Sequence, residues 1–305
     1  MVPIVFALFG LIVGSFLNVV ILRFGERSIG GRSACPSCHT QLRVGDLIPI
    51  ISWIHLRGRC RYCKHPISIQ YPLVEAGTAI FFAGIAGADL PLVPTVFALI
   101  IVSLLICLFV YDLKHKLLPD MWIWAFCILS LAFVFVTSYQ LPATSSLLSG
   151  PTAALPILFL WALSSPFAGY PGAWMGFGDV KLALGIGWLL GFPLGIVAVF
   201  FAFIIGAVVS VCILLPLPYY IKWWHGALGR ARATKLASLR PVGESGPDHV
   251  VQGSGLLTQM TMSDHANFVA GYTMKSEVPF GPFLIASCIL LWFSVLQNIQ
   301  IPFLL

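Results

Sequence analysis

Long apolar windows are the feature that most restricts how this chain of 305 residues can fold. A transmembrane helix needs about 20 predominantly apolar residues, because the hydrocarbon core of a bilayer is about 30 Å thick. Only 9% of the residues are charged, against about 25% in soluble proteins. We therefore expect an all-α polytopic membrane protein with about eight transmembrane helices, at 2–22, 72–88, 92–111, 120–138, 150–166, 181–197, 198–220 and 280–299.

Two of these windows allow a second interpretation. The sixth and seventh are separated only weakly, around Gly195, so seven helices remain an alternative. The first has no basic residue before its apolar run and no small-residue cleavage signature, which favours a retained anchor over a signal peptide.

The positive charges indicate the topology. When eight windows are threaded through a bilayer, all 17 Lys and Arg residues fall in loops on one side. Basic loops stay cytoplasmic, so both chain ends are expected outside and every sizeable loop inside. The net charge of +6 is then explained by topology and by contact with anionic lipid headgroups, not by nucleic-acid binding.

The windows divide the chain into five segments. A first helix (1–22) precedes a cytoplasmic segment with four cysteines (23–71), a block of helices (72–220), a second cytoplasmic loop (221–279) and a last helix (280–305). The middle of the second loop is polar, which is typical of a linker.

Four cysteines in the 23–71 segment have the spacing of a metal site. Cys35 and Cys38 form one C-x2-C motif, and Cys60 and Cys63 form another after 21 intervening residues. A reducing cytoplasm disfavours disulfides, whereas two such motifs suit a structural zinc ion with four thiolate ligands. Redox-active or unligated thiols are the alternatives. A site closed by four sulfurs leaves no position for substrate, so we expect a small zinc-binding loop domain that does not itself catalyse hydrolysis.

Asp112 follows the 92–111 window directly. A carboxylate at this end of a helix meets the negative end of the helix dipole and gains nothing as a cap, which favours a functional role. Pairing with the basic residues at 114–116 is the structural alternative. Asp120, directly after Pro119 and before an apolar run, suits a helix N-cap.

Asp179 is the second candidate acid, in Gly176-Phe177-Gly178-Asp179 at the cytoplasmic start of the 181–197 window. Helix capping would explain it. The two glycines, however, lack side chains and would let a peptide substrate approach the carboxylate closely. Gly176 and Gly178 are therefore candidate substrate-binding positions.

Asp112 and Asp179 are far apart in the sequence, but their windows assign both to one membrane face. Two carboxylates that meet at a partly desolvated boundary share a proton, because like charges at short range cannot both ionise cheaply. The ionised group can then deprotonate water while the protonated group donates to a scissile carbonyl. This is aspartic-protease chemistry.

In this order and on this topology, the motifs resemble the type IV prepilin leader peptidases, aspartic proteases of the bacterial inner membrane. The likeness covers most of the chain and is carried by residues 14–20, 35–63, 71–75, 112–120, 176–181 and 279–283. A lone Gly-x-Gly-Asp is a weak signal. Together with both cysteine motifs it is specific.

The resemblance implies that Asp112 and Asp179 are catalytic. It implies cleavage of the short basic leader of prepilins or pseudopilins, in pilus or secretion systems, after a Gly and before a residue that is usually Phe. Family members with the cysteine loop commonly also methylate the new N-terminus with S-adenosylmethionine. The sequence itself shows no glycine-rich nucleotide fingerprint, so the methyl donor is implied by resemblance alone.

Two further acids match the family pattern: Glu75, near the start of the 72–88 window, and Glu277, just before the last window. Acids at a membrane boundary favour a function, here attraction of the basic leader or of the nascent amine. Capping, or pairing with Lys275, is the alternative. The 221–279 loop is longer than the family pattern leads us to expect.

Two other classes of protein share some of these features. A proton-coupled transporter would also have many spans and paired acids, but it usually places them near the bilayer midplane. A non-catalytic membrane zinc protein of a pilus or secretion assembly would use the aspartates as caps.

Overall fold

The computed structural model describes residues 1–25, 30–137, 143–168, 175–214 and 279–297. Within these ranges the ordered elements are helices, and two isolated β-bridges occur in the four-cysteine segment. The main helices are α1 (Val2–Arg23), α3 (Gln70–Ala86), α4 (Leu92–His115), α5 (Asp120–Thr137), α6 (Ala143–Ala168), α7 (Phe177–Leu190), α8 (Leu194–Val209) and α11 (Gly281–Leu296). Each of the eight expected windows therefore contains a helix, and the all-α expectation is confirmed for the described part of the chain.

Three short elements complete the description. The four-cysteine segment contains a 3-10 turn, η1 (Val44–Asp46), and a short helix, α2 (Ile51–His55), and a π-helical turn, η2 (Ser210–Leu214), follows α8. The break between α7 and α8 lies at 191–193, slightly before the predicted position, and Gly195 is inside α8.

Five of the described helices are long and apolar enough to cross a membrane: Val2–Arg23, Leu92–His115, Asp120–Thr137, Ser145–Ser164 and Leu194–Cys212. The other three, α3, α7 and α11, have 17, 14 and 16 residues. They are shorter than the roughly 20 residues that span a bilayer core without local adjustment. The protein is a multi-pass membrane protein.

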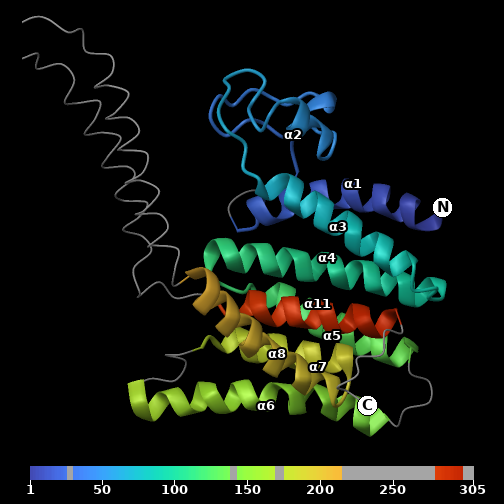
Figure 1. Ribbon diagram of the computed structural model, residues 1–305, viewed down its shortest axis with the longest axis vertical. Coiled ribbons are helices and arrows are strands. Elements are labelled where there is room, and N and C mark those ends of the chain that lie inside the picture. Colours follow the sequence, from blue (N-terminus) through green and yellow to red (C-terminus); the bar gives the residue numbers. More distant parts are fainter. Residues whose placement is uncertain (26–29, 138–142, 169–174, 215–278, 298–305) are drawn as a thin grey trace, which may run out of the picture. The chain divides into compact units, whose positions relative to one another are not determined.

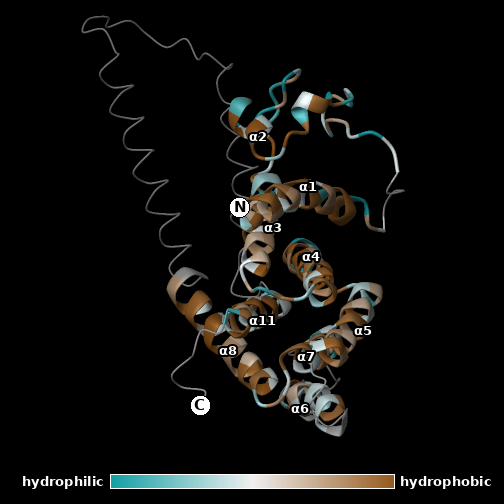
Figure 2. Cartoon of the chain, turned by 90° about the vertical axis from the view of Figure 1, so that its right-hand side faces the viewer, coloured by the Kyte–Doolittle hydropathy of each residue, from teal (hydrophilic) through white to brown (hydrophobic). Residues whose placement is uncertain are grey.

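Helix α1 shows how the bundle meets lipid. Ile4, Leu8, Ile12 and Phe16 recur every fourth residue, and each is between 57% and 66% exposed. Residues four apart share one helix face, so these side chains form an apolar stripe. Figure 2 shows the hydrophobic colouring of the helices, including α1.

The opposite face of α1 packs closely on α3, which lies beside it in Figure 1. Two glycines spaced four apart permit this approach, as in other membrane helix pairs. A Cβ added at Gly10 would lie 2.8 Å from the Cα of Ala79, and one at Gly14 would lie 2.8 Å from the Cα of Glu75. The α1–α3 contact therefore depends on backbone meeting backbone.

Helix α4 forms much of the buried core. Ala98, Ile101, Val102, Leu105 and Leu108 on this helix are fully buried. It packs on α1, α3, α5 and α11, while α7 packs on α5, α6 and α11. Helices α4 and α7, which carry the two candidate aspartates, are thus both held by α5 and α11.

Candidate functional site

The four cysteines meet at one point of the 23–71 segment. Their sulfur atoms all lie within 4.8 Å of one another, and Cys35 Sγ is 3.8 Å from Cys63 Sγ. Four sulfurs around a tetrahedral zinc ion, each about 2.3 Å from the metal, are separated by about 3.8 Å. The group could therefore hold a zinc ion with little rearrangement, as the spacing of the motifs predicts.

Each C-x2-C motif folds in the same way. The backbone N–H of His39 donates to the carbonyl of Cys35, and that of Lys64 donates to the carbonyl of Cys60. Both donors have positive φ, at 55° and 60°, which turns the chain sharply after the second cysteine of each motif.

A second hydrogen bond closes each motif. The N–H of Cys35 donates to the carbonyl of Thr40, and the N–H of Cys60 donates to that of His65. Isolated β-bridges flank both motifs, Ala34 with Gln41 and Arg59 with Pro66. The histidines next to the motifs thus contribute through their backbones.

Local hydrogen bonds also favour the thiolate form that a metal binds. The side chain and backbone of Thr40 hydrogen-bond the sulfur of Cys38 and lower the pKa of this thiol to about 6. Backbone hydrogen bonds from Cys63 and Tyr62 lower the pKa of Cys60. The thiolate form is thus favoured at Cys38 and Cys60, whereas desolvation and hydrogen bonds with the other three cysteines raise the pKa of Cys63 to about 11.

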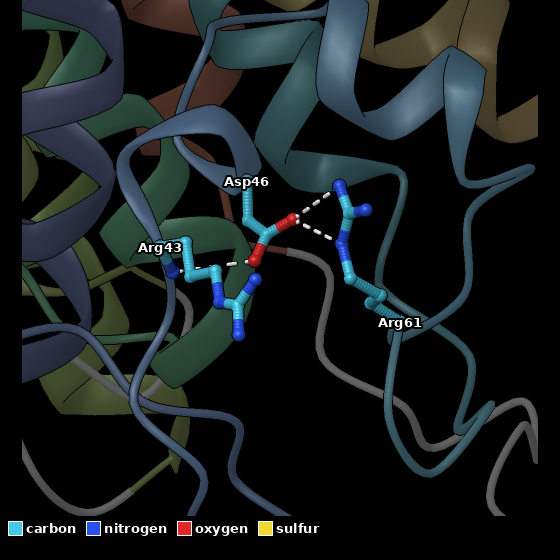
Figure 3. Close-up of polar contacts among 3 residues, drawn as sticks. All are labelled: Arg43, Asp46 and Arg61. Carbon is cyan, nitrogen blue, oxygen red and sulfur yellow. Dashed lines mark hydrogen bonds and ion pairs between the residues drawn. The ribbon is translucent and has the colours of Figure 1, made fainter.

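An ion pair joins η1 to the second motif (Figure 3). The Arg61 guanidinium donates to Asp46 Oδ1 through Nε and Nη2, at 2.8 Å in each case. Asp46 Oδ2 accepts the backbone N–H of Arg43 at 3.2 Å. Because only 3% of the Asp46 side chain is exposed, this carboxylate would be left buried and partly unpaired without Arg61.

Asp112 lies in the last turn of α4 and is 4% exposed. The helix ends soon after it, where Lys116 adopts a left-handed conformation and donates its N–H to the Asp112 carbonyl at 2.8 Å. In the described part of the chain no ion pair joins Asp112 to the basic residues at 114–116. The structural alternative, in which Asp112 pairs with these basic residues, thus has no support from the described ion pairs.

Asp179 lies in the first turn of α7 and is 7% exposed. Gly176 is the N-cap residue of this helix, and its backbone hydrogen-bonds the Asp179 carboxylate. The carboxylate thus contributes to capping, as the structural alternative proposed. The neighbouring Gly178 also faces Leu118 in the turn that follows Asp112, which capping does not require.

Two glycines and a leucine bring the aspartates' helices together. A Cβ at Gly281, the first residue of α11, would overlap Oδ2 of Asp112 and lie 3.3 Å from Cδ1 of Leu118. A Cβ at Gly178 would lie 3.2 Å from the Cβ of the same leucine. The end of α4, the turn before α5 and the starts of α7 and α11 therefore converge at one place.

Asp120 has a different role from the one its sequence position predicts. It is the first residue of α5, and the carbonyl of Pro119 accepts the first hydrogen bonds of the helix. The Asp120 carboxylate instead accepts a hydrogen bond of 2.7 Å from Nζ of Lys181. The same ammonium lies 5.3 Å from the ring centre of Phe177. Lys181 thus ties the start of α7 to the start of α5.

Glu75 lies in α3, is 7% exposed and contacts the four-cysteine segment. Its Oε2 accepts the backbone N–H of Ile50 at 2.8 Å, and it hydrogen-bonds the side chain of Ser15 on α1. Nearby, the buried Asn18 of α1 donates to the carbonyl of Tyr71 at 3.1 Å. A polar cluster thus joins α1, α3 and the cysteine segment, and Glu277 lies outside the described residues.

The sequence matches two family models. Residues 8–88 match the "Bacterial Peptidase A24 N-terminal domain", and residues 99–211 match the "Type IV leader peptidase family". A prepilin leader peptidase/N-methyltransferase of Bacillus subtilis is 34% identical over 225 residues, which cover 70% of this chain and 86% of the relative. The chain belongs to the type IV leader peptidase family. It is therefore a membrane peptidase, which excludes the transporter and the non-catalytic zinc protein.

Other leader peptidases give the same result. A prepilin leader peptidase/N-methyltransferase of Aeromonas hydrophila is 32% identical over 239 residues, covering 68% of this chain and 80% of the relative. One of Myxococcus xanthus is 49% identical over 115 residues, covering 36% of this chain and 33% of the relative. No solved structure matches the chain significantly.

Sequence reasoning missed three of the contacts that build this peptidase's site. Leu118 and Gly281 were parts of matched motifs but had no assigned role, and the partner of Asp120 was not foreseen. The sequence signal for Gly281 is its position before an apolar window and next to a proline.

Proposed function

We propose that the protein is a two-aspartate leader peptidase in which Asp112 and Asp179 perform the hydrolysis. The observation that carries the proposal is the convergence of two buried carboxylates from different helices, α4 and α7, at one end of the bundle, where Leu118 links Gly178 and Gly281 beside them. Burying an ionised carboxylate is expensive unless the charge is compensated. Two such groups at one end of the bundle, neither held in an ion pair within the described residues, favour chemistry over stability.

The reaction follows from the shared proton of the pair. One carboxylate removes a proton from a water molecule, and the resulting hydroxide attacks the scissile carbonyl carbon. The protonated partner donates to the carbonyl oxygen, which forms a neutral tetrahedral intermediate. When the C–N bond breaks, the carboxyl group that took the water proton passes it to the departing amine. A hydroxyl of the intermediate returns its proton to the other carboxylate as the new carbonyl forms, and the pair regains its one shared proton.

The substrate is a prepilin or pseudopilin with a short basic leader, cut after Gly at the cytoplasmic face of the inner membrane. The one-sided distribution of Lys and Arg supports this orientation. In the structure, Lys181 and Asp112 lie at the same end of the bundle, because the starts of α5, α7 and α11 meet the end of α4 there. Gly176 and Gly178 are proposed substrate-binding positions beside Asp179: an added Cβ at Gly176 would lie 3.9 Å from Asp179 Oδ2, whereas Gly178 faces Leu118.

A second activity is N-methylation of the new N-terminal residue with S-adenosylmethionine as donor. The names of the relatives from Bacillus and Aeromonas support it, as do the intact cysteine motifs. Zinc held by Cys35, Cys38, Cys60 and Cys63 would fix the fold of the 23–71 segment. Glu75 and Glu277 are proposed to help bind the leader or the new amine.

Mass spectrometry of a prepilin's N-terminus tests this function. The prepilin is co-expressed with the parent protein, Asp112→Asn or Asp179→Asn. We expect the parent to remove the leader and add 14 Da, roughly the mass of one methylene, and each variant to insert normally but leave the leader intact, with losses above about 10³-fold. Normal cleavage by either variant would refute the two-aspartate mechanism.

A further inference from the structure

Leu118 occupies an unusual position at the site. It lies in the turn between α4 and α5, and its side chain packs against the apolar core. On one side it faces Gly178, the residue before Asp179. On the other it faces Gly281, which itself lies against the Asp112 carboxylate. One leucine therefore touches the neighbours of both aspartates.

The contact with Gly178 is close. A Cβ there would lie 3.2 Å from Cβ and 3.3 Å from Cδ1 of Leu118. Such separations are shorter than ordinary carbon contacts of about 3.5–4.0 Å. A side chain at position 178 would push the first turn of α7 away from Leu118, and Asp179 would move with it.

The contact at Gly281 has two components. A Cβ there would meet Cδ1 of Leu118 at 3.3 Å and would also overlap Oδ2 of Asp112. Removing the Leu118 side chain would relieve the contact with Cδ1 but would leave the overlap with Asp112 Oδ2. This difference between the two glycines makes the arrangement testable.

Backbone conformation does not explain either glycine. The described glycines with positive φ are Gly25, Gly31, Gly58 and Gly191, and neither Gly178 nor Gly281 is among them. Both adopt conformations open to any L-residue. Glycine is therefore favoured at these two positions because neighbouring atoms occupy the space that a side chain would need.

We propose that Leu118 is a positioning residue that sets the separation of Asp112 and Asp179, with Gly178 and Gly281 as the two surfaces it packs between. This inference rests on the proposed two-aspartate function. It differs from the expectation that Gly178 is small so that substrate can approach. If Leu118 sets the spacing, a methyl group added at position 178 collides with Leu118. If Gly178 is small for substrate approach, the same methyl group collides with the substrate.

The test is a double-mutant experiment on leader cleavage by the full-length enzyme. Gly178→Ala is expected to lower kcat about tenfold with little change in KM, since small displacements of catalytic groups have large effects. Leu118→Gly removes both the Cβ and the Cδ1 that a methyl added at position 178 would meet, so kcat of Gly178→Ala/Leu118→Gly is expected to recover about fivefold. Gly281→Ala is expected to lower kcat about 100-fold, and Leu118→Gly should not restore it.

Controls separate this inference from its premise. Gly77→Ala in α3, where an added Cβ meets nothing within 4 Å, should leave cleavage unchanged. Loss of cleavage in Asp112→Asn and Asp179→Asn, measured in parallel, supports the two-aspartate function by itself. If those variants are inactive but Leu118→Gly fails to rescue Gly178→Ala, or if Gly178→Ala raises KM alone, the spacing role of Leu118 is refuted. Equal rescue of both glycine variants would refute it too.

Discussion

Glu75 of α3 accepts the backbone N–H of Ile50 at 2.8 Å and so holds the four-cysteine segment to a membrane helix. Ile50 has φ of 60° and directly precedes α2. A positive φ is unfavourable for a β-branched residue. The hydrogen bond therefore supports a backbone conformation that isoleucine would not adopt readily by itself.

This relationship predicts different results for two substitutions of Glu75. Glu75→Gln keeps an oxygen that can accept the Ile50 N–H, whereas Glu75→Leu leaves that N–H unpaired. We expect limited trypsin digestion to cut the 23–71 segment of the leucine variant several-fold faster than that of the parent or of the glutamine variant. If charge attracts the leader, the glutamine variant should show a raised KM with normal protease resistance. Equal resistance in all three proteins would contradict the anchoring role.

The Lys181–Asp120 pair is expected to affect activity more than stability. Asp120 is 67% exposed, and exposed ion pairs contribute about 0.2–1 kcal/mol. Lys181→Met and Asp120→Asn should therefore each lower kcat several-fold with a small change in melting temperature. The double variant should lose little more than either single variant. Fully multiplicative losses in kcat would show that the two residues act separately.

Metal content tests the cysteine cluster. Cys38→Ser or Cys60→Ser should remove most of the zinc from the purified protein, as measured by atomic absorption, because a four-ligand site loses one thiolate. Cys212→Ser, which changes an exposed cysteine outside the cluster, is the matched control. We expect methylation to fall more than cleavage in the first two variants. Unchanged zinc content would mean that the cluster is not a zinc site.

Gly187 lies where α6 and α7 pack closely, so a larger residue at this position is expected to lower the stability of the protein. A Cβ at this position would overlap the carbonyl oxygen of Ser149 and lie 2.6 Å from the Cβ of Ala153. Gly187→Val should destabilise the protein by about 1–3 kcal/mol through overpacking, visible as a lower melting temperature in detergent. Gly77→Ala should melt like the parent. A valine variant as stable as the parent would show that the helices can separate freely.

Much of this architecture could be predicted because its signals are local. Apolar windows predict helices wherever about 20 apolar residues occur together. Each C-x2-C motif is recognised from the spacing of its own two cysteines. The placement of Asp112 and Asp179 at one end of the bundle followed from counting spans. The structure agrees at each of these points, although α7 and α11 are shorter than the predicted windows.

The contacts between helices could not be predicted in this way. Asp120 was interpreted as a cap because the sequence shows Pro119 before it, but not Lys181 opposite it. Likewise, nothing near Gly281 in the sequence indicates that Asp112 fills the space beside it. Such contacts depend on which helices become neighbours and on their rotation, and a nearly all-apolar helix gives little periodic signal for either.

The matching hydrogen bonds of the two cysteine motifs have a consequence for how metal is acquired. Each half presents its pair of sulfurs on a turn closed by its own backbone hydrogen bonds, so a metal ion entering the cluster would meet two preformed pairs of ligands. An ion held by all four sulfurs would close the intervening chain, including η1 and α2, into a loop.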